Sequence, residues 1–288
     1  MKIVRIIYLV LVVVCMQTIV ACQDDWEKLN NGADVNTPVT VDLSFGVPRS
    51  TEIVLTRADN SESDIYGIRI YIFNGERYLG MREINTLQEV SNDDAGRRYR
   101  ASNVSLYQGT QTVYAVANIT RTGYFQDATG LLTSLEEEAQ KGKTEFLAKL
   151  YTLASATIEG GNLPQFTTQY MPLSGVGDIT VNSATNVQGT VELKRMVAQV
   201  NFKINTEQTN SDGHKITFAP QSYIFYNVPE QGYMIEKDNA NTPATNYYNT
   251  KSVVIGGATG DENQAYFSVY VPENIQTAKN PCEVYNNR

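Results

Sequence analysis

The sequence predicts a mainly β protein built from β-sandwich domains. Its 288 residues include 18 tyrosines and a single tryptophan, and Val, Ile and Thr recur throughout, a mixture that favours strands over helices. Short runs of alternating apolar and polar residues are separated by turn-rich loops, which is typical of β-sandwiches. With 42% hydrophobic residues, the chain is long and apolar enough for one or two packed domains.

The chain begins with a segment typical of an exported protein. Lys2 and Arg5 precede an uncharged apolar run over residues 6–16. This run is too short for a membrane-spanning helix, which needs roughly 20 apolar residues, and it suits the core of a signal peptide. We therefore expect a signal peptide over residues 1–21.

The next residues indicate a lipid anchor. The tetrapeptide IVAC at 19–22 resembles a bacterial lipobox, in which the small Ala21 fits the signal peptidase and the Cys22 thiol takes the acyl chains. An ordinary secretory signal cut after Ala21 is the alternative. The acidic DDWE at 24–27 resembles a surface-export signal of outer-membrane lipoproteins, and it also fits a solvated tether. We expect a lipidated tether over residues 22–37, with its acyl chains in the outer membrane.

The first strand is predicted directly after this tether. Its apolar residues recur at every second position and share one face of an extended chain: Val39, Val41, Leu43 and Phe45. A looser extended run leads from this strand to Arg57, which precedes a polar patch. A strand that lies between an anchor and an exposed arginine is one that a protease can cut away, and residues 38–57 are the expected removable segment. Arg49, kept exposed by a turn at Pro48, is the second candidate cleavage site, and both arginines also fit ordinary loop residues.

The chain after the polar patch contains two further strands and one helical region. In residues 65–73, Ile68, Ile70 and Ile72 occupy one face and aromatic residues the other, which predicts a strand covered on both sides. The following Asn-Gly at 74–75 predicts a hairpin with a type I′ turn. Residues 110–119 alternate in the same way. Residues 131–153 have helical spacing, and we expect two short helices split at Gly142, with a capping box at Ser134.

A long alternating run, residues 190–204, predicts the first strand of a second domain. Shorter strands are expected at 223–228, 252–255 and 265–271. Between the first two lies a polar stretch, residues 237–250, that is rich in Asn and Tyr and predicts an exposed loop.

Composition and motifs exclude several classes of function. The formal net charge of −8 disfavours nucleic acid as a partner. A single histidine, His214, leaves little scope for His-based metal or acid–base sites, and no nucleophile, phosphate-binding or CxxC motif is present, so we expect neither enzyme activity nor a metal or cofactor. Of the three cysteines, Cys15 lies in the leader and Cys22 is the lipid site, so only Cys282 remains and a disulfide is not expected.

The ordered set of motifs resembles the fimbrillin family, the subunits of type V pili. Besides the lipobox, the first strand and Arg57, it comprises IYIFNG ending at Gly75, AVAN at 115–118, YMPLSG at 170–175, LKRMVAQVNF at 193–202 and YVPEN at 270–274. The resemblance implies two tandem transthyretin-like sandwiches, here residues 38–188, with the short helices, and residues 189–288. It also implies export as a lipoprotein, cleavage by an arginine-specific protease, and polymerisation with other pilus subunits by donor-strand exchange.

Two features leave alternatives open. Family members continue for several strands beyond the position of YVPEN, so the second sandwich is expected to be incomplete, either in a truncated chain or in a member that accepts a strand without donating one. The alternative function is that of a surface glycan-binding lipoprotein with a β-sandwich fold, for which Tyr247 and Tyr248 are the candidate aromatic platform. In either case a ligand on a host or bacterial surface is a possible partner.

Overall fold

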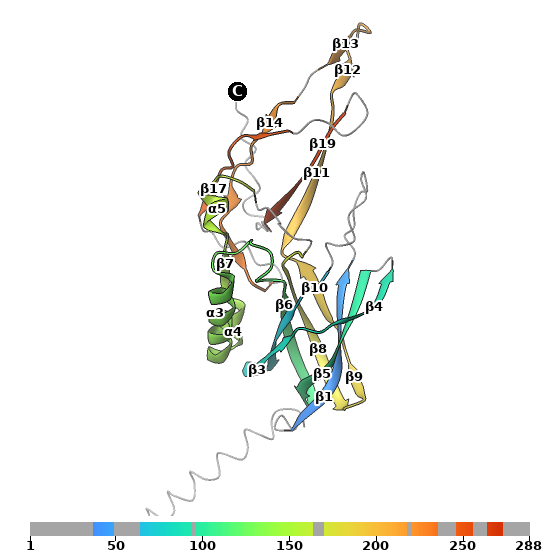
Figure 1. Ribbon diagram of the computed structural model, residues 1–288, viewed down its shortest axis with the longest axis vertical. Helices are drawn as coiled ribbons and strands as arrows, with labels where there is room; N and C mark the ends of the chain where they lie inside the picture. Colours follow the sequence, from blue (N-terminus) through green and yellow to red (C-terminus); the bar gives the residue numbers. More distant parts are fainter. Residues whose placement is uncertain are drawn as a thin grey trace, which may run out of the picture.

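The computed structural model describes residues 37–48, 64–93, 96–163, 170–217, 220–235, 246–255 and 264–272. Within these residues most of the regular structure is β-strand, and the predicted mainly β class is confirmed. No helix in this part of the chain is both long and apolar enough to span a membrane. Figure 1 shows an elongated molecule, with a large sheet at one end and small two-stranded sheets toward the other.

Nine of the described strands form one sheet, in the order β3-β2-β6-β8-β10-β1-β5-β4, with β9 paired to β8. Its strands are β1 (Pro38–Pro48), β2 (Ile68–Asn74), β3 (Arg77–Ile84), β4 (Gln88–Asp93), β5 (Gly96–Tyr107), β6 (Gly109–Ala117), β8 (Leu173–Ser183), β9 (Asn186–Gln188) and β10 (Val191–Arg195). All neighbouring pairs are antiparallel except β1 and β10, which are parallel. Strand β1 therefore lies inside the sheet, with a neighbour on each side.

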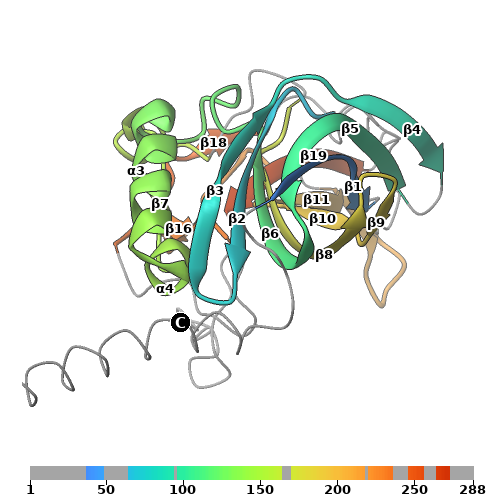
Figure 2. The ribbon, with the colours of Figure 1, turned by 90° about the horizontal axis from the view of Figure 1, so that it is seen from below.

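The sheet curls until strands near its two ends meet. The Arg82 side chain of β3 donates a hydrogen bond from Nε to the Ser105 carbonyl of β5, at 3.2 Å. The Tyr107 hydroxyl of β5 donates to the Leu79 carbonyl of β3, at 3.1 Å. Figure 2 shows the strands bent around a common interior.

This interior holds one of two apolar cores, which we call the inner core. It is built from residues of seven strands, among them Leu43, Phe45, Ile70, Ile72, Leu106, Val113, Leu173, Val191 and Leu193. All nine side chains are fully buried. Burial of apolar side chains is the main force that holds these strands together, at about 1.5–3 kcal/mol for each large one.

The second core, the outer core, lies on the other face of β2 and β6 beneath α3 (Ala128–Lys141) and α4 (Lys143–Leu147). The ring of Phe146 packs against Tyr71, Phe73 and Tyr114, with centroids 5.0, 5.2 and 5.3 Å apart. The expectation that both faces of β2 are covered is thus confirmed.

The helix break at Gly142 is confirmed, but the predicted cap is wrong. Helix α3 begins after Asp127, whose Oδ1 accepts a hydrogen bond from the Gly130 N–H at 3.0 Å. Leu131 and Leu132 are buried in the first turns, so the helix must start upstream of Ser134 to place them on the outer core. Beyond α4 the expected helical region ends in a strand, β7 (Leu150–Thr152).

The hairpin between β2 and β3 is also confirmed, with a different turn. Asn74 pairs with Arg77, so Gly75 and Glu76 are the two central residues. Only Gly75 has a positive φ, of 58°. A type I′ turn needs positive φ at both central residues, whereas glycine in the first position alone is typical of type II′.

The run 190–204 is two strands in different sheets. Its first half is β10, which belongs to the large sheet, and its second half is β11 (Val197–Asn205), which pairs with β19 (Gln264–Pro272). Val191 and Leu193 are the buried positions of β10, whereas the even-numbered Val200, Phe202 and Ile204 are the half-buried positions of β11. The period changes at Met196, which is buried and whose N–H donates to the Pro172 carbonyl at 3.0 Å. The expectation of one continuous strand is therefore wrong.

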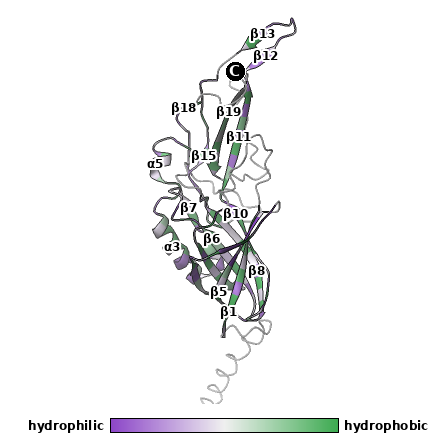
Figure 3. Cartoon of the chain, turned by 45° about the vertical axis from the view of Figure 1, so that its right-hand side comes forward, coloured by the Kyte–Doolittle hydropathy of each residue, from purple (hydrophilic) through white to green (hydrophobic). Residues whose placement is uncertain are grey.

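The remaining described strands form two-stranded sheets. They pair β7 with β16 (Gln231–Tyr233), β15 (Val228–Pro229) with β17 (Tyr247–Tyr248), β14 (Ser222–Tyr223) with β18 (Val253–Val254), and β12 (Glu207–Thr209) with β13 (Lys215–Thr217). A short helix, α5 (Ser155–Ile158), precedes β8. Figure 3 shows hydrophobic and hydrophilic residues interchanging along longer strands such as β1 and β11. The tandem transthyretin-like arrangement and the two domain ranges stay predictions.

Candidate functional site

Strand β1 occupies a slot between β5 and β10. It pairs with β5 along its length, from Pro38 opposite Tyr107 to Pro48 opposite Gly96. Its pairing with β10 is restricted to the level of Phe45 and Gly46. We call the space between β5 and β10 that β1 fills the β1 slot.

The predicted apolar face of β1 points into the inner core. Leu43 and Phe45 are 0% exposed and Val41 is 2% exposed, while Val39 is half-buried at the edge of the same core. Val47 continues this face and is also buried. The sequence does not predict Val47 as part of this face, because Gly46 and Pro48 are typical of a strand end, although the two-residue period extends to it.

Removal of β1 would open both the ladder and the core. β1 has four buried apolar side chains: Val41, Leu43, Phe45 and Val47. The burial of each contributes roughly 1.5–3 kcal/mol to the stability of the fold. The backbone N–H and C=O groups of β5 that face β1 would also lose their partners, which is costly for buried groups. An empty slot is therefore a strong acceptor for another strand of the same pattern.

A β-bulge fixes where a strand sits in the slot. Val41 lies opposite Val104 and Leu43 opposite Ala101, so two residues of β5 face the single residue Asp42. One of the two is Asn103, whose φ of 61° is left-handed. A bulge of this kind pins the register, because a slip by one residue would turn the apolar face outward.

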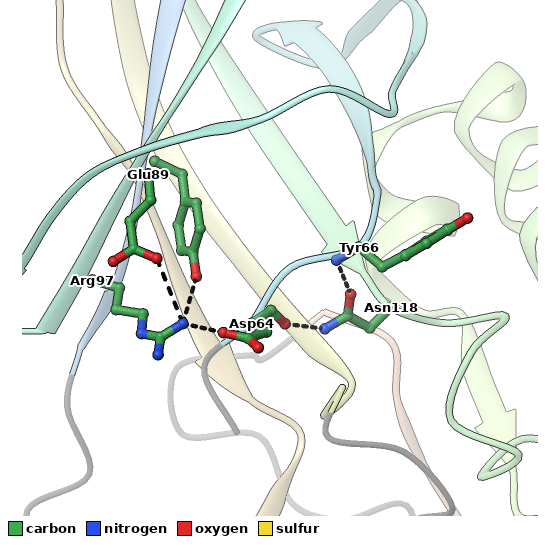
Figure 4. Close-up of polar contacts among 6 residues, drawn as sticks. Asp64, Tyr66, Glu89, Arg97 and Asn118 are labelled. Atoms are coloured by element: carbon green, nitrogen blue, oxygen red, sulfur yellow. Dashed lines mark hydrogen bonds and ion pairs between the residues drawn. The ribbon is translucent and has the colours of Figure 1, made fainter. Parts of the chain in front are cut away.

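The next described segment after β1 begins at Asp64, and hydrogen bonds to Asn118 hold its first residues. The buried Asn118 side chain, at the end of β6, accepts a hydrogen bond from the Tyr66 N–H at 2.9 Å and donates to the carbonyls of Asp64 and Met171, both at 2.8 Å. Its own N–H donates to the Gly67 carbonyl. We call these contacts the Asn118 clamp, and Figure 4 shows those with Tyr66 and Asp64.

An arginine on β5 completes this attachment. Arg97 forms an ion pair with Asp64, a second with Glu89 at 3.6 Å, and a hydrogen bond to the Tyr99 hydroxyl at 3.4 Å (Figure 4). Although burial by itself would lower the pKa of Arg97, the Tyr99 hydroxyl and the two carboxylates raise it. The segment Asp64–Gly67 is thus held by contacts of its own, separate from the pairing of β1.

The other predicted site residues lie outside the described residues. They are Ala21 and Cys22 at the expected lipobox, and Arg49 and Arg57 at the expected cleavage sites. The described chain ends at Pro48 on one side of the cleavage segment and begins again at Asp64 on the other.

The aromatic platform predicted for glycan binding does not form. Tyr248 is 8% exposed, pairs with Val228, and donates its hydroxyl to the Asn162 carbonyl at 2.9 Å. Burial raises its pKa to about 12. Tyr247 alone is exposed, because adjacent residues of a strand point to opposite faces.

No group of three or more metal-ligating side chains lies together in the part of the chain that the structure describes. His214 occupies the turn between β12 and β13, where its N–H donates to Asn210 Oδ1 at 2.8 Å.

Comparison with protein families finds one that spans most of the chain. The sequence profile of the fimbrillin-A associated anchor proteins Mfa1 and Mfa2 matches residues 28–287. No curated protein matches this chain.

Several solved structures resemble the fold at low sequence identity. A candidate cell adhesion protein from Parabacteroides distasonis is 14% identical, with 83% of this chain and 72% of that chain covered and a TM-score of 0.46. A fimbrial assembly protein from the same organism is 13% identical, with 83% and 78% covered and a TM-score of 0.42. A candidate cell adhesion protein from Bacteroides eggerthii is 13% identical, with 84% and 73% covered and a TM-score of 0.45.

Proposed function

This chain belongs to the family of fimbrillin-A associated anchor proteins Mfa1 and Mfa2, and on that basis we propose that it is a structural and adhesive subunit of a cell-surface pilus. In this proposal β1 is a temporary occupant of its slot, and a strand from another subunit replaces it during assembly. The partners are therefore other pilus subunits, and the mature protein belongs to the fimbrium.

The observation that carries the proposal is the position of β1. It is the first described strand of the chain, yet it lies inside the sheet and seals the inner core with Leu43 and Phe45. A strand at the start of the chain can leave without threading through the rest of the fold. Its departure would open a deep apolar slot between two strands that remain, which is the geometry that strand addition requires.

The order of events follows from the position of the cleavage segment. The precursor is exported as a lipoprotein, with Cys22 lipidated after cleavage at Ala21 and its acyl chains in the outer membrane. A cut after Arg57, or after Arg49, separates β1 from the body of the subunit. The same cut releases the subunit from its lipid anchor.

The Asn118 clamp supports this order. It fastens Asp64–Gly67 to the end of β6 and to Met171, both outside β1. Loss of β1 would then leave β2 held at its start. Until the cut, β1 fills the slot and prevents the sheet from joining other subunits too early.

Treatment of the purified, unlipidated precursor with an arginine-specific protease tests the proposal. We expect heat-labile oligomers in a regular ladder, and a new N-terminus at Ala58 or at Ser50. The variants Arg57→Lys and Arg49→Lys serve as matched controls, since each removes one site and keeps the charge. A fully cut subunit that remains monomeric and retains its fragment 38–48 would contradict strand exchange.

A further inference from the structure

An ion pair crosses the β1 slot directly above Gly46. Gly46 lies opposite Arg98 of β5 and opposite Glu192 of β10. Directly paired residues of neighbouring strands point to the same face of a sheet. The three residues therefore form one row on the outer face, with Arg98 Nη1 2.5 Å from Glu192 Oε1.

The two charged side chains meet because the residue between them has no side chain. Neighbouring strands lie about 4.8 Å apart, so β5 and β10 are separated by roughly 10 Å at this level. Only two long side chains can bridge that distance. A Cβ atom added to Gly46 would lie 2.3 Å from an atom of each charged group, so the flexible ends of the Arg98 and Glu192 side chains would have to move apart.

The ion pair also covers the strand. Gly46 is buried although it belongs to the outer face of the sheet, on which Asp42 is exposed. The backbone of β1 at this position thus has the inner core on one side and the Arg98–Glu192 pair on the other.

We propose that the Arg98–Glu192 pair makes the β1 slot prefer a strand with glycine at this register, because a larger residue there must separate the two side chains. The inference rests on the proposed strand exchange. The partner that fits is a β-strand of another subunit, antiparallel to β5, with alternating large apolar residues toward the inner core and glycine beneath the ion pair.

The selection works together with the bulge at Asn103. Both side chains are nearly half exposed, and an exposed ion pair contributes about 0–1 kcal/mol, so separation of the pair gives a preference for glycine of up to about 1 kcal/mol. A strand with a side chain in this position must separate Arg98 from Glu192. It cannot avoid them by shifting one residue, because the bulge and the apolar face fix the register.

The first test measures the intact precursor, where no exchange is needed. Gly46→Val is expected to lower the thermal midpoint by about 2 °C or more in the native background. In the Arg98→Ala/Glu192→Ala background the same change is expected to leave the midpoint unchanged or raise it, because valine favours strands. Ser44→Val, two residues earlier on the same outer face, is the matched control and should act alike in both backgrounds. Equal effects of Gly46→Val in the two backgrounds would overturn the inference.

The second test measures entry of a strand into the emptied slot. A labelled peptide of residues 38–48 and its Gly46→Val form are offered to the protease-cut precursor. We expect about fivefold weaker binding of the valine peptide to the native protein, corresponding to roughly 1 kcal/mol, and equal binding of both peptides to the Arg98→Ala/Glu192→Ala variant. The charge-exchanged variant Arg98→Glu/Glu192→Arg should restore the difference.

The two tests separate the inference from the proposed function. If neither peptide binds while the effects of Gly46→Val differ between backgrounds, strand exchange fails and the steric role of the ion pair stands. If both peptides bind equally well to the native protein, exchange is supported and the selective role of Arg98 and Glu192 is refuted.

Discussion

A single residue, Asn118, joins three parts of the chain that are distant in sequence. Its side chain is 3% exposed and contacts the backbone of Asp64, Tyr66 and Met171, while its φ of 64° places it in the left-handed region. Asparagine is one of the few residues with a side chain that tolerates this conformation. It therefore meets a conformational requirement and a hydrogen-bonding requirement at one position.

Substitution of Asn118 separates these two requirements. Asn118→Gly keeps the left-handed conformation and loses the side-chain hydrogen bonds, which should lower the free energy of unfolding by about 1–3 kcal/mol. Asn118→Ala also carries backbone strain and should cost about 1 kcal/mol more. Urea denaturation measures both values.

The exposed Asn103, also left-handed, provides the control for Asn118. Asn103→Ala should show only the conformational cost, and Asn103→Gly should be close to neutral. If Asn118→Gly were as stable as the native protein, the clamp would contribute nothing to the fold.

At the scale of elements, the helical layer rests on tyrosines whose hydroxyl groups are shielded from water. Tyr71 of β2 and Tyr78 of β3 pack in or against the outer core, and the Tyr78 hydroxyl has no hydrogen-bond partner among the described residues. Burial raises the pKa of Tyr78 from 10.0 to about 12, with the Glu136 carboxylate adding to the shift, and burial raises the pKa of Tyr71 as well. The packing of α3 on the sheet thus depends on neutral phenols.

The raised pKa values predict a loss of stability in alkali. A tyrosine whose folded pKa lies above its unfolded value holds its proton more tightly in the folded state, so its contribution is fully present below about pH 10 and is lost as the pH rises toward about 12. The free energy of unfolding should therefore fall across this interval.

Tyr78→Phe provides the comparison for this prediction. It should flatten the fall, and near pH 7 it should be neutral or stabilising because an unpartnered hydroxyl is removed. Denaturant titration at several pH values measures the slope. An unchanged slope in Tyr78→Phe would show that this phenol does not titrate with unfolding.

At the scale of the whole molecule, the large sheet depends on β1, which comes before all its other strands in the chain. Strand β1 joins β10 to the β5–β4 hairpin, and it supplies Leu43 and Phe45 to the inner core. Helices α3 and α4 pack on the opposite face of β2 and β6 and do not depend on the slot. Loss of β1 should therefore damage the inner core selectively.

A chain that begins at Ala58 tests this dependence. By itself it should self-associate, because the slot exposes apolar surface and unpaired backbone groups. Addition of a peptide with the sequence of residues 38–48 should return it to a soluble monomer, as measured by size-exclusion chromatography. A peptide with Leu43→Ser and Phe45→Ser should fail to do so, and a monomeric chain without any peptide would argue against an open slot.

Local features of this protein follow from its amino-acid sequence. Alternation at every second residue predicted the apolar face of β1 and the two covered faces of β2, because side chains of a strand point to opposite sides wherever the strand is placed. Gly142 predicted the helix break and Gly75 predicted the hairpin, because each feature depends on the backbone conformation of one residue. The order of motifs indicated the family.

Which segments lie next to one another is visible only in the folded chain. Nothing in residues 38–48 specifies that β5 and β10 lie on either side, and the change of period at Met196 does not show that β10 and β11 belong to different sheets. The meeting of Arg98 and Glu192 above Gly46, and the three contacts of Asn118, join residues that are far apart in the chain. The alternation of apolar and polar residues shows which face of a segment is apolar. Which other segment covers that face depends on the packing of all segments together.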